Sequence, residues 1–157
     1  MKDKITFDKI QSKNSEDLIE LIAHWYFDEW GIPMEYSCKR LTNIPNKDVV
    51  FQLILFKNNN PVATGGLYKK VNLLNVYPKF KIFEPWIGLL YTTKENRNLG
   101  FGTKLLLKIE ELSKEIGYNT IYLHTYSAEK LYLSNNWKSI DKAHYKEHTT
   151  IVMRKEL

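Results

Sequence analysis

The segment from Arg97 to Lys104 carries the residue types and spacing of a binding loop for a bulky anion. Gly100 and Gly102 have no Cβ, so the backbone there can pass close to a phosphate group. A strand-like run precedes the segment and a periodic helix follows it, so the free N–H groups of the first helical turn would point at the anion. The Arg97 guanidinium adds a charge-assisted contact. These features predict a pyrophosphate site.

Two other phosphate-binding loops have related glycine patterns, and the residues exclude both. A P-loop needs a glycine, then four residues of any type, then Gly-Lys followed directly by Ser or Thr. The sequence contains no such string. A dinucleotide-binding loop needs a third glycine three residues after the second, where Leu105 stands.

The spacing Arg-x-x-Gly-x-Gly resembles the acetyl-coenzyme A loop of the GNAT superfamily of N-acetyltransferases. The parts that follow the loop in that family are also present: an amphipathic helix over 103–117, a strand over 120–125, and a short helix before an Asn-Trp step at 136–137. The resemblance covers residues 85–157 well and the first half of the chain loosely.

Two asparagines stand where the family commonly has glycine. Asn98 follows the arginine, and Asn136 precedes the aromatic residue. Asparagine tolerates left-handed backbone better than other non-glycine residues, so both substitutions fit the family pattern.

The resemblance implies acetyl-CoA as the acetyl donor, an amine as the acceptor, and direct transfer in a ternary complex. A backbone N–H of the strand over 86–92 is expected to meet the thioester carbonyl, and the same strand to pair with pantetheine. The residues expected at the cofactor are Leu89, Leu90, Tyr91, Thr92, Arg97, Asn98, Leu99, Gly100, Phe101, Gly102, Thr103 and Lys104.

The resemblance also implies that Tyr132 protonates the departing thiolate, although an aromatic residue on a short amphipathic helix also suits a core. The general base is left open between Glu29, Glu84 and His124. Glu29 is the favoured carboxylate for the acceptor, because acids at a helix C-terminus are disfavoured by the dipole and Trp30 beside it could bind an ammonium.

Aromatic residues of the first half could form walls of an acceptor site. The candidates are Trp25, Tyr26, Trp30, Tyr36 and Trp86. The sequence leaves open whether the acceptor is a small amine or a peptide amine. A non-catalytic CoA-binding module with the same fold is the alternative function.

Composition agrees with one globular domain over residues 1–157. The chain is 43% hydrophobic with a net charge of +5, and its lysines are scattered, which favours a solvated surface over a nucleic-acid site. No 18-residue apolar run or secretory leader is present, so we expect no membrane association. The single Cys38 fits a reducing cytoplasm, and the histidines show no metal-ligand spacing.

The pattern of elements predicts a mixed α/β domain of the GNAT fold, with a mostly antiparallel sheet splayed at the cofactor strand and flanked by helices. A hairpin over 49–68 and a closing hairpin over 138–155 are expected. The segment 70–83 is expected to be a surface loop, Ser127 to cap the short helix, and Glu110 to pair with Lys114 outside. Whether the protein is a monomer or a homodimer is left open.

Overall fold

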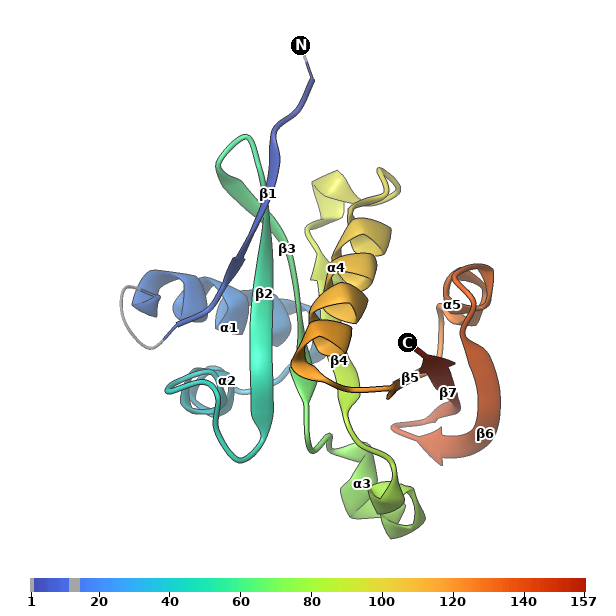
Figure 1. The fold of residues 1–157 in the computed structure, drawn as a ribbon. Coiled ribbons are helices and arrows are strands. Elements are labelled where there is room, and N and C mark those ends of the chain that lie inside the picture. Colours follow the sequence, from blue (N-terminus) through green and yellow to red (C-terminus); the bar gives the residue numbers. More distant parts are fainter. Residues whose placement is uncertain (1, 12–14) are drawn as a thin grey trace.

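The computed structural model describes residues 2–11 and 15–157. Within these ranges, seven strands form one sheet in the order β1-β2-β3-β4-β5-β7-β6 (Figure 1). The strands are β1 (Ile5–Lys9), β2 (Val49–Lys57), β3 (Asn60–Tyr68), β4 (Trp86–Thr92), β5 (Thr120–Thr125), β6 (Lys138–Tyr145) and β7 (His148–Glu156). The helices are α1 (Glu16–Trp30), α2 (Met34–Arg40), α3 (Leu73–Val76), α4 (Phe101–Ile116) and α5 (Glu129–Ser134), with 3₁₀ turns η1 (Pro78–Ile82) and η2 (Lys94–Asn96). The mixed α/β fold predicted from the sequence is confirmed.

Helices cover both faces of the sheet (Figure 1). Strand β2 alternates between the two faces: Leu53 and Leu55 pack in the core formed with α4, whereas Ile54 packs in the core formed with α1. This alternation follows from the two-residue period of a strand that is buried on both sides. Helices α1 and α4, on which the predicted site depends, are thereby packed on opposite faces of the sheet.

The centre of the sheet is irregular where β4 meets its neighbours. Thr64 of β3 pairs with Tyr91 of β4, and Gly66 pairs with Gly88. Between these two pairs β3 has one residue, whereas β4 has two. The extra residue is a β-bulge, and Leu89 within it has a positive φ of 56°. On its other edge, β4 runs parallel to β5 and pairs with it at one position, Trp86 with Tyr122. The two strands therefore separate beyond this pair.

Three local expectations were wrong. The segment 70–83 forms α3 and η1 instead of a loop, because Leu73, Leu74 and Phe80 are buried in a small core with Trp86. Ser127 does not cap α5: the N-cap is Ala128, and no side chain among the described residues caps the helix. Thr125 Oγ1 instead accepts hydrogen bonds from the Ser127 and Ala128 N–H groups in the turn before it.

The third correction concerns Glu110, which is buried instead of facing solvent. Its carboxylate accepts hydrogen bonds from the Lys155 ammonium and from the Trp137 indole N–H, the latter at 3.2 Å. Glu110 therefore joins α4 to the end of β7 and does not pair with Lys114.

Across the described ranges, no helix is both long and apolar enough to cross a bilayer.

Candidate active site

A cavity of about 950 Å³ opens where β4 and β5 separate. At its cofactor end, defined by Thr92, Arg97, Asn98, Gly102 and Tyr132, the wall comes from β4, the loop before α4, and α5. At its acceptor end, defined by Tyr36, Arg40, Asn72, Tyr145 and Lys146, the wall comes from α2, the segment after β3, and the β6–β7 turn. The cavity thus connects the predicted phosphate loop to a second, separate set of side chains.

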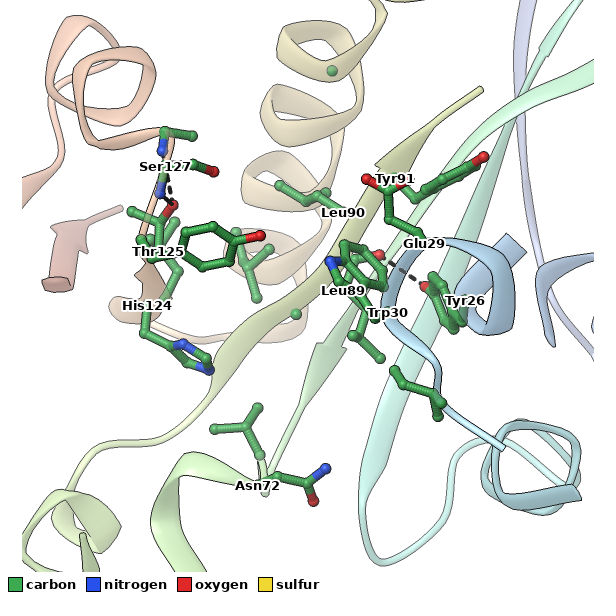
Figure 2. Close-up of a pocket in the computed structure, with 18 of the residues that line it drawn as sticks. Tyr26, Glu29, Trp30, Asn72, Leu89, Leu90, Tyr91, His124, Thr125 and Ser127 are labelled. Atoms are coloured by element: carbon green, nitrogen blue, oxygen red, sulfur yellow. Dashed lines mark hydrogen bonds between the residues drawn. The ribbon is translucent and has the colours of Figure 1, made fainter. Parts of the chain in front are cut away.

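The β4 bulge is held by a hydrogen bond from α1. The Tyr26 hydroxyl donates to the Leu89 carbonyl at 2.8 Å, a contact drawn in Figure 2. The same hydroxyl accepts a 2.9 Å hydrogen bond from the Gln52 amide, whose oxygen accepts one from Tyr68 at 2.6 Å. All three side chains are buried, so the chain of hydrogen bonds fixes the left-handed Leu89 and the strand edge beside it.

The loop before α4 has the backbone of an anion-binding turn. Asn98 and Gly100 adopt positive φ values of 63° and 87°, which confirms that asparagine takes a left-handed conformation here; Asn136 does so too, at 70°. The first backbone hydrogen bond of the helix runs from Lys104 N–H to Gly100 O, so the preceding N–H groups have no partner within the helix. A Cβ at Gly102 would meet only Thr92 Oγ1, 3.9 Å away. The space beside Gly102 is therefore open to a phosphate group.

Arg97 is anchored at the cofactor end by two hydrogen bonds. Its Nε donates to the Thr92 carbonyl at 2.8 Å, and one Nη donates to Glu29 at 3.2 Å. Glu29 lines the cavity, and its partner is the arginine of the loop before α4. This contact differs from the expected one with an acceptor amine.

Tyr132, a residue of α5, lies on the cavity wall and is 8% exposed. Its ring packs edge-on against Trp137, with 6.0 Å between the centroids. Its hydroxyl has no hydrogen-bond partner among the described residues. Burial raises the pKa of Tyr132 to about 12, so the phenol stays protonated and can donate a hydrogen bond into the cavity.

His124 lies on β5, on the wall opposite β4 (Figure 2). Its imidazole meets the rings of Trp86 and Tyr145 edge-on, at centroid distances of 6.1 and 5.8 Å. Burial, followed by the charge of Lys146, lowers the pKa of His124 to about 4. The side chain is therefore neutral at physiological pH and can accept a hydrogen bond.

The structure does not bring Glu84 to these residues. Glu84 is exposed before β4, outside the cavity lining, and its charge acts on Tyr118 after the end of α4. Among the aromatic candidates, Tyr26, Trp30 and Tyr36 line the cavity. Trp25 instead stacks on Tyr91 outside the cavity lining, and Trp86 is fully buried in the sheet.

The twelve predicted cofactor residues divide into two groups. The cavity wall includes Leu89, Leu90, Tyr91, Thr92, Arg97, Asn98 and Gly102. The wall does not include Leu99, Gly100, Phe101, Thr103 and Lys104. Phe101 is 5% exposed and packs in the core, so only the backbone of this residue is available to a phosphate.

Sequence reasoning missed Arg40, Asn72 and Lys146 at the acceptor end, and residues 125–128 at the cofactor end. No motif marks these residues, since they come from separate elements that only the fold brings together. In the described part of the chain, no cluster of three or more His, Cys, Asp or Glu side chains could hold a metal ion.

Comparison with solved structures gives matches over nearly the whole chain. An aminoglycoside 6'-N-acetyltransferase complexed with coenzyme A matches with a TM-score of 0.73 at 14% identity, covering 96% of both chains. A GNAT-family acetyltransferase from Staphylococcus aureus Mu50 gives 0.68 at 23% identity, covering 98% of this chain and 99% of the other. Arabidopsis thaliana Naa50, in complex with the bisubstrate analogue CoA-Ac-MVNAL, gives 0.67 at 15%, with the same coverage. These likenesses establish the fold.

A comparison with curated protein sequences gave no match. The family model described as "Acetyltransferase (GNAT) family" matches residues 15–134, which is most of the chain. That match includes α1, the bulged strand, the phosphate loop and Tyr132. The chain therefore belongs to the GNAT acetyltransferase family.

Proposed function

We propose that this protein transfers an acetyl group from acetyl-CoA to an amine, with both substrates bound at once in the cavity between β4 and β5. The observation that carries the proposal is the continuity of this cavity, which joins the loop at Arg97 to a second set of polar side chains at Arg40. A cofactor can enter at one end while an acceptor occupies the other. Direct transfer then needs no covalent enzyme intermediate.

The cofactor end fits coenzyme A on the geometry of its own residues. The free N–H groups at the start of α4, the open space at Gly102 and the Arg97 guanidinium suit a pyrophosphate. The β5-facing edge of β4 beyond Trp86 suits the amide groups of pantetheine, which can pair with it as an added strand would. Glu29 would position Arg97, since it already holds the guanidinium against the end of β4.

When bound, acetyl-CoA supplies an acetyl thioester. The left-handed Leu89 turns the backbone of β4, and an N–H of residues 89–91 would polarise the thioester carbonyl. One oriented donor of this kind contributes about 2.7–4 kcal/mol of transition-state stabilisation. The protonated Tyr132 hydroxyl would donate to the departing sulfur, and neutral His124 would accept a hydrogen bond from the attacking amine, directly or through water.

Gly102→Val is expected to weaken CoA binding by at least about 100-fold, because a branched side chain would occupy the phosphate space and displace charge-assisted hydrogen bonds. The fold should be kept, since the nearest neighbour of a Cβ there is 3.9 Å away. Calorimetry with coenzyme A measures the effect. Glu115→Val, on the exposed last turn of the same helix, is the matched control. Undiminished affinity in folded Gly102→Val would exclude the loop as the phosphate site.

Tyr132→Phe should lower acetyl transfer by about 10²–10⁴-fold, the usual contribution of a general acid. Because the ring and its contact with Trp137 remain, the melting temperature and the Kd for coenzyme A should stay near wild type. Tyr118→Phe removes a hydroxyl outside the cavity and serves as the control. Turnover within a few-fold of wild type would leave Tyr132 a packing role only.

His124 should make the protein less stable as the pH falls from about 6.5 to about 4. The unfolded chain takes up a proton near pH 6.5, whereas folded His124 does so only near 4, so unfolding becomes easier in this window. The full effect is about 3 kcal/mol. Denaturant unfolding over this pH range should show a smaller decline for His124→Gln than for the exposed control His24→Gln. Identical pH profiles, or an imidazole titrating near 6.5 by NMR, would contradict the buried neutral state.

A further inference from the structure

We infer that the acceptor amine carries a carboxylate, and that Arg40 binds this carboxylate at the acceptor end of the cavity. The inference rests on the proposed acetyl transfer, because it names the class of molecule that receives the acetyl group. The predicted acceptor is therefore a free amino acid, or another small amine that carries a carboxylate, and not a polycation.

Arg40 lies at the opposite end of β4 from Arg97. It is the last residue of α2 and its guanidinium packs on Tyr68, which pairs with Trp86 at the start of β4. Arg97 instead binds Thr92, the last residue of that strand. The two arginines therefore serve different parts of the cavity, and Arg40 is too distant from the phosphate loop to share its anion.

The Arg40 guanidinium is held in place without a counter-ion. One Nη donates to the Lys70 carbonyl, and the group lies 4.7 Å from the ring centre of Tyr68 and 5.8 Å from that of Tyr36. Its Nε is buried and has no hydrogen-bond partner among the residues that the structure describes. The contacts with the two rings and with the Lys70 carbonyl fix the orientation of the planar guanidinium, and a fixed guanidinium is well suited to a carboxylate.

The charges around Arg40 favour an anion over a cation. Lys146, from the β6–β7 turn, also lines the acceptor end, and neither it nor Arg40 forms an ion pair within the described ranges. Glu29 is the one carboxylate on the described cavity wall, and it pairs with Arg97. An acceptor with several ammonium groups would meet two cations here and no free acid.

A second hydrogen-bond donor faces the same space. Asn72 accepts a hydrogen bond from the Tyr36 hydroxyl at 3.3 Å through its side-chain oxygen, which leaves its amide N–H groups free for a ligand. In Figure 2, Asn72 and His124 lie on either side of the lower part of the cavity. A small amino acid could place its carboxylate near Arg40 and Asn72 while its amine lies toward His124 and the β4 edge.

Calorimetry on the CoA-saturated protein tests the inference without requiring turnover. The probes are N-acetylated L-amino acids, each compared with its own carboxamide, which removes only the negative charge. We expect the carboxylate to bind at least about tenfold more tightly than the amide, the effect of one charge-assisted contact. Arg40→Gln should reduce this ratio to within about twofold and leave the Kd for coenzyme A unchanged.

Two variants separate recognition from general charge and folding effects. Lys39→Gln removes the same charge from the neighbouring exposed residue and should keep the preference for the carboxylate. Arg40→Lys keeps the charge but loses the planar fork, and should give an intermediate ratio.

Equal binding of acid and amide by the wild type, or a ratio unchanged in Arg40→Gln, would overturn the inference. So would faster acetylation of spermidine or kanamycin than of any amino acid. The proposed function would be refuted instead if carboxylates bind in an Arg40-dependent manner but the protein acetylates neither amino acids nor spermidine nor kanamycin.

Discussion

The hydrogen bond from Tyr26 to the Leu89 carbonyl is the interaction on which the site depends. It ties the helix on one face of the sheet to the single irregular point of β4, where the backbone has a positive φ and an extra residue. The buried Gln52 and Tyr68 complete this network, so the bulge is enforced from both neighbouring elements. The bulge lies on β4 just beyond its one pair with β5, at Trp86 and Tyr122, where the cavity opens.

Charge is distributed unevenly along the cavity between β4 and β5. Arg97 and Arg40 lie near its two ends, and their surroundings differ: the first has Glu29 as a partner, whereas the second stacks on aromatic rings. Glu29 holds the Arg97 guanidinium in place and neutralises part of its charge. Arg40 has no ion pair among the described residues, so its charge remains available to an anion at that end of the cavity.

Local signals account for what the sequence could predict. The glycine-bearing loop, the period of α4 and the alternation of β2 each lie within one stretch of chain, so the fold class and the left-handed Asn98 followed from the residues. Arg40, Asn72 and Lys146 come from three separate elements, and only tertiary packing brings them together. The contact between Glu29 and Arg97 could not be predicted either, because the two residues are 68 positions apart in the sequence.

A crystal structure with acetyl-CoA, or with a non-reactive ketone analogue of its thioester, tests the central claim most directly. The account predicts the pyrophosphate on the N–H groups that begin α4, and the carbonyl oxygen within about 3.2 Å of a backbone N–H of residues 89–91. The Tyr132 hydroxyl should point to the sulfur. A cofactor bound outside the space between β4 and β5, or a carbonyl with no backbone donor from β4, would contradict it.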